Sequence, residues 1–343
     1  MKLAIHHIES GTFSERWIDY CIQREIPYKP VNCYDSDIIA QINDCDALLW
    51  HHNHVLPKDV LFARQLLVSV ESSGKSVFPD YRTGWHFDDK LGQKYLMEAL
   101  NLPLVPSYSF YSKPDAITWF KTTSFPKVFK LRGGAGSKNV MLVRNMHEAL
   151  SIADKAFGRG FRQYNAFTAI REQVRKFRLG KAGMTDIIKA MAHIVYPLKV
   201  EQAKGREKGY VYFQDFMPDN LFDIRVIVIG NKAFAIKRMV RQNDFRASGS
   251  GHILYKKEDI DERCVSLAFL SNQKIRSQCI AFDFVFDQNN NPLIVEISYG
   301  FMAKGYDPCP GYWDKEMNWH EGKFNPYGWM IDHLIETIGA ETR

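Results

Sequence analysis

The chain has 343 residues, of which 45% are hydrophobic, 24% charged and 13% aromatic, with a formal net charge of +6. These values exclude intrinsically disordered, collagen-like and coiled-coil proteins and are typical of a globular protein. The length predicts two or three domains, since a domain usually contains roughly 100–200 residues. A membrane span needs about 20 consecutive apolar residues, and the sequence has no such run, so we expect no membrane span.

The cysteines and the N-terminal residues bear on the cellular compartment. None of the six cysteines forms a CxxC pair, which favours reduced thiols over a disulfide framework or a zinc site. The first residues become polar too early for a signal peptide. We therefore expect a cytoplasmic protein. The cysteines are Cys21, Cys33, Cys45, Cys264, Cys279 and Cys309.

The first eighty residues alternate between strand and helix patterns. Strands are expected at residues 2–8 and 46–50, and helices at residues 14–25 and 57–74. The second helix has Pro57 at its first position and Gly74 at its end, which is the usual asymmetry. This alternation predicts a small parallel α/β sheet. The first strand is not followed by a GxGxxG motif, so a dinucleotide-binding fingerprint is absent.

Three histidines, His51, His52 and His54, follow the second expected strand. Imidazole is a common metal ligand, but no cysteine or acidic residue completes a metal-binding spacing. The favoured interpretation is a loop at the end of a strand. The same position also allows contact with a substrate, because ligands of open α/β sheets bind at the carboxyl ends of strands.

The rest of the chain predicts further mixed structure. We expect an amphipathic helix over residues 88–100 and a helix that begins at Pro114. The expected strands are at residues 127–131, 139–143, 210–216, 223–229, 232–240, 279–286 and 292–297, with a helix near residues 261–273. The predicted domains are residues 1–86 (parallel α/β), 87–208 (α+β with a glycine-rich loop) and 209–343 (α+β with an aromatic-rich tail).

Residues 171–208 form a basic segment that contains ten Lys or Arg and four Asp or Glu. Such a segment can attract nucleic acid, an anionic substrate or nucleotide phosphates, or it can be a solvated helix face. Because no RNA-binding or helix-turn-helix pattern accompanies it, no nucleic-acid partner is expected. The segment is predicted to be helical as far as Ala192.

A glycine-rich loop lies between the expected strands at residues 127–131 and 139–143. Glycines allow backbone N–H groups to approach an anion closely, and a lysine at the end of the preceding strand adds a positive charge. The sequence therefore makes this hairpin a candidate phosphate site. Its candidate residues are Lys130, Gly133, Gly134, Gly136 and Ser137.

Asp283 and Glu296 lie on the last two expected strands, each within an apolar run. Two carboxylates in such strands are costly to bury unless they are paired or bind a cation. Carboxylate oxygens suit Mg²⁺, which is typically bound by one or two carboxylates together with substrate phosphates. The alternative is a pair of acidic side chains facing an edge of the sheet.

Basic side chains recur on and after the preceding strands, at Arg225, Arg238 and Arg246. Arginines can neutralise the charge of a phosphoryl group during transfer, or they can be cross-strand charges on a solvated face. The strand at residues 210–216 is apolar and ends in Gln214, Asp215 and Phe216. By itself this pattern indicates a buried strand.

Taken in order, these features resemble the ATP-grasp superfamily of carboxylate–amine ligases, and most closely its glutamate-adding branch. The resemblance extends from about residue 88 to residue 298. It implies an α/β (α+β ATP-grasp) fold, in which an N-terminal parallel α/β domain is followed by two α+β subdomains that enclose ATP.

The resemblance also implies roles for individual residues. Lys90, Lys130 and the glycine loop would bind the ATP phosphates, and Gln214, Asp215 and Phe216 would form the adenine hinge. Asp223 and Arg225 match the family's D-I-R strand. Arg225, Arg238 and Arg246 would act on the γ-phosphate and an acyl phosphate. Mg²⁺ would be held by Asp283, Glu296 and Ser298.

Three positions depart from the family pattern. Asp215 stands where Glu is usual, Ser248 where Asn is often found, and Ser298 where the metal motif usually has Asn. The shorter Asp215 reaches less far towards ribose. A serine hydroxyl still ligates Mg²⁺, and Lys130 and the two carboxylates are retained, so we expect ATP binding.

The resemblance implies that ATP activates a small-molecule carboxylate as an acyl phosphate, which an amine then converts to an amide. One alternative keeps the fold but phosphorylates a hydroxyl group, and another is a nucleotide-binding module without turnover. The oligomeric state, including a homodimer, stays open.

The aromatic-rich residues 299–343 either line an acceptor pocket or pack on the core, with packing slightly favoured. Within this tail, Cys309 is considered as a nucleophile. That role is disfavoured, because no activating partner lies near it in the sequence.

Overall fold

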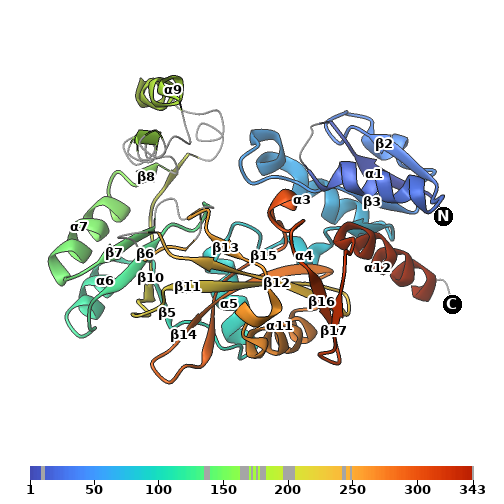
Figure 1. Cartoon of the computed structure of the whole chain (residues 1–343). Helices are drawn as coiled ribbons and strands as arrows, with labels where there is room; N and C mark the ends of the chain where they lie inside the picture. The colour runs from blue at the N-terminus through green and yellow to red at the C-terminus, as the bar shows by residue number, and fades with distance from the viewer. Residues whose placement is uncertain are drawn as a thin grey trace.

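The computed structural model describes residues 1–8, 12–134, 140–162, 170, 173, 174, 177, 183–195, 205–241, 245–247 and 249–341. Three sheets organise the chain (Figure 1). Within the basic segment, residues 171, 172, 175, 176, 178–182 and 196–204, and elsewhere Gly136, Ser137 and Ser248, lie outside the described residues. Predictions about them therefore stay predictions.

The first sheet is parallel and has the strand order β2-β1-β3-β4. Its strands are β1 (Leu3–His6), β2 (Tyr28–Val31), β3 (Ala47–Leu49) and β4 (Ser76–Phe78). They alternate with α1 (Phe13–Gln23), α2 (Ile38–Gln41) and α3 (Pro57–Ser72). The predicted parallel α/β sheet is confirmed, but β2 was not predicted. β2 is an edge strand that contains Pro30. Proline interrupts the usual sequence pattern of a strand, but an edge strand tolerates the missing N–H group.

The second sheet has the order β5-β10-β6-β7. It contains β5 (Ser107–Phe110), β6 (Lys127–Lys130), β7 (Val140–Val143) and β10 (Val211–Asp215). β6 and β7 pair antiparallel from Lys127 opposite Val143 to Lys130 opposite Val140, as expected of a hairpin around the glycine loop. The helices α6 (Lys113–Phe120) and α7 (Met146–Phe157) pack on this sheet around their own core. The domain boundary at residues 208/209 stays a prediction, since strands from both sides of it form this sheet.

The third and largest sheet has the order β15-β14-β11-β12-β16-β17, with β13 (Ile253–Leu254) paired to β12. All its pairings are antiparallel. The other strands are β11 (Phe222–Ile229), β12 (Lys232–Met239), β14 (Cys279–Phe286), β15 (Pro292–Ser298), β16 (Gly311–Asp314) and β17 (Trp319–Glu321). The predicted hairpin of β14 and β15 is confirmed.

The two faces of β11 show why this sheet carries both a core and a polar site. Ile224, Val226 and Val228 point to one face and pack against α11 (Glu262–Ile275). Ile227 and Ile229 point to the other face and pack with Leu3, Ile5 and Leu49 of the first sheet. Asp223 and Arg225 share this second face because side chains alternate along a strand. One half of this face is therefore core, and the other half is polar.

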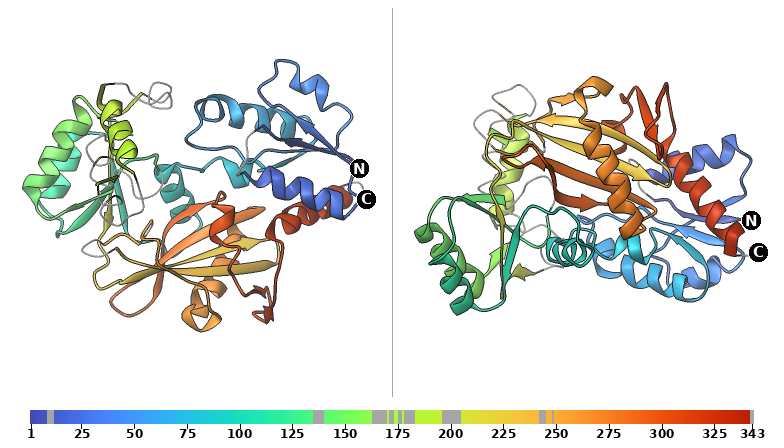
Figure 2. Two further views of the ribbon diagram at one scale, coloured as in Figure 1. Left: turned by 45° about the horizontal axis from the view of Figure 1, so that its top comes forward. Right: turned by 90° about the horizontal axis from the view of Figure 1, so that it is seen from below.

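The last helix, α12 (Pro326–Glu341), joins the first and third sheets. Tyr20 of α1 donates hydrogen bonds to Asp332 of α12 at 2.8 and 2.9 Å. The two ends of the chain consequently lie side by side (Figure 2).

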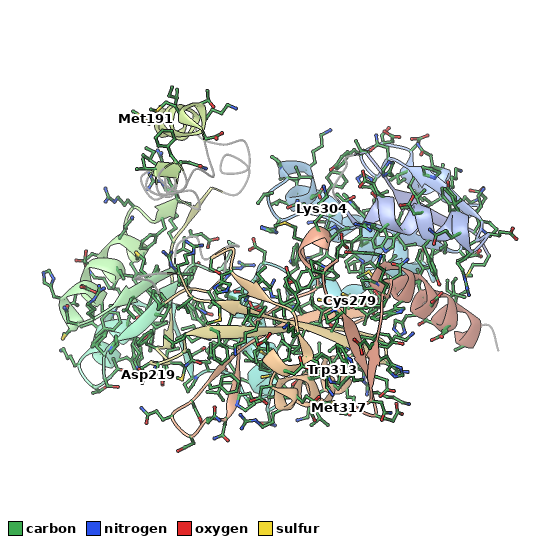
Figure 3. The ribbon with its side chains drawn as sticks, viewed as in Figure 1. Met191, Asp219, Cys279, Lys304, Trp313 and Met317 are labelled. Atoms are coloured by element: carbon green, nitrogen blue, oxygen red, sulfur yellow. The ribbon has the colours of Figure 1, made fainter. Side chains whose placement is uncertain are left out.

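Three further helices are α4 (Tyr81–Gly84), α5 (Lys90–Ala99) and α9 (Met184–Val195), and short β8 (Phe161–Arg162) pairs with β9 (Arg206–Glu207). The α9 helix stands away from the three sheets, with Met191 on its surface (Figure 3). Within the described part of the chain, no helix has the length and apolar character that a membrane crossing requires.

Candidate active site

A cavity of about 550 Å³ lies where the three sheets meet. It brings together most of the predicted site residues from α5, β6, β10, β11, β12, β14 and β15. Those lining it are Lys90, Lys130, Gly134, Gln214, Asp215, Phe216, Asp223, Arg225, Arg238, Arg246, Asp283, Glu296 and Ser298. Gly133 is buried just before Gly134 in the same loop.

Strand register explains the charged row on the third sheet. Asp283 of β14 lies opposite Arg225 of β11 on one side and opposite Glu296 of β15 on the other. Residues directly opposite in antiparallel strands have side chains on the same face. Arg225 therefore donates two hydrogen bonds to the carboxylate of Asp283, one from Nε and one from Nη2, which lies 2.7 Å from Oδ2. The predicted neighbourhood of Asp283 and Glu296 is confirmed.

A second arginine completes this row. Asp223 lies opposite Arg238 in the pairing of β11 with β12, and Arg238 donates to both carboxylate oxygens at 2.6 Å. The Nη2 atom of Arg238 also lies 3.0 Å from Asp283 Oδ2. Burial raises the pKa of Asp283, but the charges and hydrogen bonds of the two arginines outweigh it and hold that pKa below its usual range.

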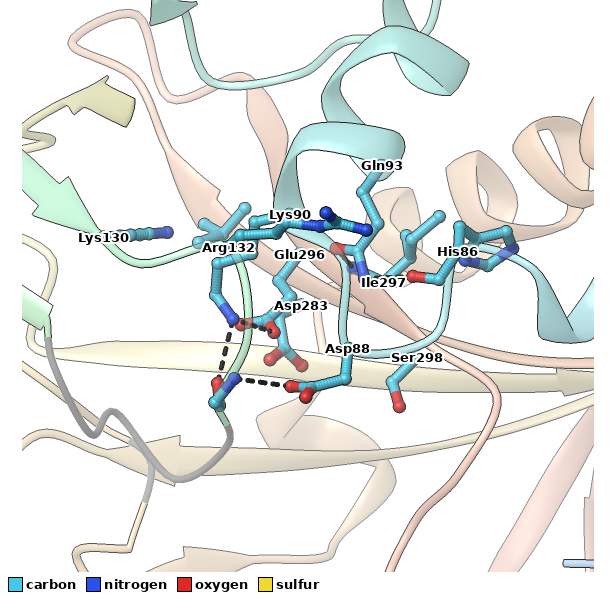
Figure 4. A network of polar contacts seen from close by, with 12 residues as sticks. His86, Asp88, Lys90, Gln93, Lys130, Arg132, Asp283, Glu296, Ile297 and Ser298 are labelled. Atoms are coloured by element: carbon cyan, nitrogen blue, oxygen red, sulfur yellow. Dashed lines mark hydrogen bonds and ion pairs between the residues drawn. The ribbon is translucent and has the colours of Figure 1, made fainter. Parts of the chain in front are cut away.

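Lys90, at the start of α5, connects the glycine loop with Glu296 (Figure 4). Its Nζ donates to Gly134 O at 2.9 Å and lies 3.2 Å from Glu296 Oε1. Asp88 accepts a hydrogen bond from Gly134 N at 2.6 Å. Burial lowers the pKa of Lys90, yet the negative charges of Glu296 and Asp88 raise it further, so the net shift is upwards. Lys90 is therefore a firmly charged group.

Lys130 differs from Lys90. Its Nζ donates to Gln214 Oε1 at 2.5 Å, and burial is the main reason that its pKa falls to about 8. The positive charge of Lys90 contributes to this decrease, and Glu296 opposes it. Lys130 therefore lines the cavity as a buried lysine that loses its proton at a lower pH than an ordinary lysine.

Gln214 has a role that the sequence did not reveal. Its amide nitrogen donates to Ser107 Oγ at 3.1 Å and to Val295 O at 3.3 Å, so it links β10 to β5 and β15. Beside it, Asp215 accepts a hydrogen bond from Lys127 Nζ at 2.6 Å. The carboxylate of Asp215, which lines the cavity, is thus held by a buried lysine.

The histidine loop also lines the cavity, together with Phe87 and Asp88. His51, His52 and His54 lie in a loop that follows β3, as the favoured interpretation expected, and contact with a substrate stays a prediction. No group of three or more His, Cys, Asp and Glu is arranged to hold a metal ion in the described part of the chain. Phe87 and Asp88 do not belong to a sequence motif, so only the fold shows that they line the cavity.

The aromatic tail divides between the two predicted roles. Phe301 and Met302 line the cavity, whereas Trp313 and Tyr327 are buried in the cores. Cys309 is buried as well, and burial raises the pKa of its thiol to about 12. A thiol of this kind stays protonated and is a poor nucleophile, so the structure gives the nucleophile hypothesis no support.

Comparison with known proteins agrees with this geometry. Residues 199–307 match the family model of the RimK-like ATP-grasp domain. No curated protein sequence matches the chain.

Solved structures similar to the whole chain include three enzymes or domains of this fold. A RimK domain ATP-grasp protein from Sphaerobacter thermophilus is 14% identical, with a TM-score of 0.55, and the match covers 98% of this chain and 100% of that one. The D-cycloserine synthetase DcsG is 12% identical, with a TM-score of 0.58 and coverage of 98% and 100%. A D-alanine–D-alanine ligase from Bacillus anthracis, complexed with ATP, is 13% identical, with a TM-score of 0.52 and coverage of 99% and 98%.

At these identities the similarity shows the fold, and the family model adds the domain type. The chain therefore has the ATP-grasp fold, and its residues 199–307 match the RimK-like ATP-grasp domain.

Proposed function

We propose that this protein is an ATP- and Mg²⁺-dependent ligase that activates a carboxylate as an acyl phosphate and joins it to an amine. The observation that supports this most directly is the single cavity lined by Lys90, Lys130, Arg225, Arg238 and the two carboxylates of β14 and β15. Cations beside carboxylates suit the binding of nucleotide phosphates together with a divalent metal ion. The buried free cysteines are in keeping with a reducing cytoplasm.

The cavity has separate surfaces for the base and for the phosphates of ATP. Apolar side chains, among them Val128, Phe216 and Val240, also line the cavity and would suit a purine ring. Lys90 and Lys130 lie where the glycine loop begins, so they would hold the phosphates. The amide group of Gly134 belongs to the same surface.

The oxygen donors of the site fit Mg²⁺. Asp283 and Glu296 lie opposite each other across adjacent strands, and Ser298 shares the strand face of Glu296 two residues further on. The side chain of Glu296 is 31% exposed, so it is the more accessible of the two carboxylates, since that of Asp283 is 11% exposed. Bound there with ATP, Mg²⁺ would neutralise phosphate charge.

In the proposed first step, a carboxylate oxygen of the substrate attacks the γ-phosphorus of ATP. The new O–P bond forms as the bond to the β-phosphate oxygen breaks, which releases ADP. Arg225, Arg238 and Arg246 line the cavity and would stabilise the negative charge of the transferring group.

In the second step, the amine attacks the acyl carbon. The C–N bond forms, the C–O bond to phosphate breaks, and the nitrogen loses a proton. The products are an amide and inorganic phosphate. The surrounding side chains would exclude water, which otherwise hydrolyses the acyl phosphate.

Hydroxylamine trapping tests this proposal. The protein is incubated with Mg·ATP, hydroxylamine and a pool of small carboxylic acids, and both ADP and hydroxamates are measured by mass spectrometry. We expect hydroxamate with the wild-type protein and a loss of at least about 100-fold in Glu296→Ala, which lacks a phosphate-site carboxylate. Thermal unfolding with and without Mg·ATP shows whether each protein still binds the nucleotide.

Two results would contradict the proposal. ADP and a phosphorylated compound without hydroxamate would indicate a kinase that acts on a hydroxyl group. Mg·ATP binding without any ADP release across the pool would favour a nucleotide-binding module instead.

A further inference from the structure

The cavity has a wall without Lys, Arg, Asp or Glu side chains that the proposed chemistry does not use. This wall comprises the loop of residues 51–54 together with Phe87, Gly300, Phe301 and Met302, and all of these residues line the cavity. The loop follows β3 of the first sheet, whereas Gly300 to Met302 follow β15 of the third sheet. The wall is therefore formed by the segment that follows β3 and the segment that follows β15.

The ring of His51 is held in one orientation. It stacks on Phe13 with ring centroids 3.6 Å apart and planes inclined by 5°. Phe13 N donates a hydrogen bond to His51 Nδ1 at 3.3 Å. A neutral imidazole that accepts at Nδ1 carries its proton on Nε2. His51 therefore offers an N–H donor at Nε2.

The space beside this donor is left open by a glycine. A Cβ atom added to Gly300 would lie 3.4 Å from His51 Nε2 and 3.4 Å from the Phe87 ring. Any larger side chain at this position would therefore occupy the space between the imidazole and the phenyl ring. The absence of a side chain at Gly300 leaves room for a ligand group there.

His52 is held just as firmly. Tyr299 Oη donates to His52 O at 2.9 Å, and the His52 ring packs against Phe87 and Tyr299 at centroid distances of 5.3 and 5.2 Å. The carboxylate of Asp59 accepts a hydrogen bond from Asn53 N at 2.5 Å. Contacts from both the first and third sheets thus fix the loop.

The wall contains no Lys, Arg, Asp or Glu side chain. Burial lowers the pKa of His51 and of His52 to about 3, so both rings are uncharged. His54 lowers the pKa of both rings, and His51 and Arg64 also lower that of His52, but Arg64 does not belong to the described lining. The lysines and arginines of the described lining belong instead to α5, β6, β11, β12 and the segment after β12.

We propose that this wall is a specificity subsite for an uncharged, apolar side chain, aromatic or aliphatic, of one of the two joined substrates. The His51 Nε2–H group donates to a polar atom of that substrate, and Phe87, Phe301 and Met302 contact its apolar part. A second carboxylate, such as that of glutamate, would enter this wall without a basic partner and would lose its hydration. This assignment rests on the proposed ligase function and names the class of its substrate.

Calorimetric titration of the full chain with Mg²⁺ and the non-hydrolysable analogue AMP-PNP tests the subsite. The probes are L-phenylalanine, L-leucine and L-glutamate. We expect one of the neutral probes to bind at least about tenfold more tightly than glutamate. N-acetyl-L-phenylalanine and L-phenylalaninamide then show whether the carboxylate or the amine substrate occupies the wall, since each retains one of the two reacting groups.

Three variants locate the effect. In Gly300→Ala the added methyl fills the space beside His51, so the neutral probe should bind about tenfold more weakly while the Kd of AMP-PNP stays unchanged. Gly305→Ala is the matched control, because a Cβ there meets nothing within 4 Å. In Met302→Arg, at a side chain that is 77% exposed, the new cation should improve glutamate binding about threefold.

The subsite is overturned if glutamate binds more tightly than both neutral probes or if neither neutral probe binds with AMP-PNP present. Equal affinities of Gly300→Ala and Gly305→Ala for the neutral probe would also overturn it. These failures differ from failure of the ligase proposal, because AMP-PNP binding and hydroxamate formation are measured independently of the probes.

Discussion

Lys130 is a buried cation that loses its proton near pH 8, because burial lowers its pKa from the ordinary value of 10.5. The side chain is charged below this pH and becomes neutral as the pH rises through it. In the proposed binding mode a nucleotide would place negative phosphates near this group, and negative charge stabilises the protonated lysine. Nucleotide binding and protonation of Lys130 are therefore coupled.

From this coupling we expect the Kd of Mg·ATP to increase as the pH rises from 7.5 to 9.5, by at most about tenfold per pH unit. Lys130→Arg keeps a positive charge over this range, so its Kd should depend much less on pH. Isothermal titration calorimetry of both proteins measures the two profiles. A wild-type Kd that is constant up to pH 9.5 would show that Lys130 does not contact the phosphates.

At the scale of elements, α3 positions the histidine loop through one residue of its first turn. Asp59 is buried and accepts hydrogen bonds from Asn53 N and from Tyr34 Oη, the latter at 2.6 Å. Hydrogen bonds to a charged group are stronger than neutral ones. The helix thereby fixes a loop that lines the cavity.

Asp59→Ala should lower the free energy of unfolding by about 1–3 kcal/mol, because it leaves the Asn53 N–H and the Tyr34 hydroxyl without this acceptor. Urea denaturation measures the loss, and amide exchange at residues 51–55 should become faster. Tyr34→Phe is the milder comparison, since it removes one of the two bonds. Equal effects of the two variants would mean that the Asn53 bond contributes little.

The sequence predicted the elements better than their contacts. Residues within one hairpin, such as Asp283 and Glu296, follow from alternation and a single turn. The contact between Arg225 and Asp283 depends instead on the register of β11 against β14, whose partners are distant in the sequence. For the same reason, no local sequence pattern indicates that Phe87 lines the cavity or that Asp59 accepts a hydrogen bond from Asn53. The short β2 was missed because Pro30 disrupts its pattern.

For the whole molecule, one core is shared by the first sheet, the third sheet and α12. Ile331 of α12 is fully buried within it. Sequence patterns showed that each segment has an apolar face, but not which faces meet. The shared core predicts that the two sheets unfold together.

Ile331→Ala should therefore cost about 2–5 kcal/mol and destabilise β3 and β11 together. Urea denaturation gives the free energy, and amide exchange reports on each strand. Glu336→Ala, at an exposed position of the same helix, serves as the control. Faster exchange confined to one of the two sheets would contradict a shared core.

The second sheet has a core of its own, separate from the one that α12 completes. Between β5 and the preceding helix, residues 103–105 attach it to β15 through Val105 N to Ile294 O at 2.9 Å and Ile294 N to Pro103 O at 2.7 Å. The cavity thus lies between two sheets that share one core and a second sheet that has its own core. If the proposed ligase releases ADP by separating these two parts, we expect the attachment at residues 103–105 to bend, and Val105 of this attachment itself lines the cavity.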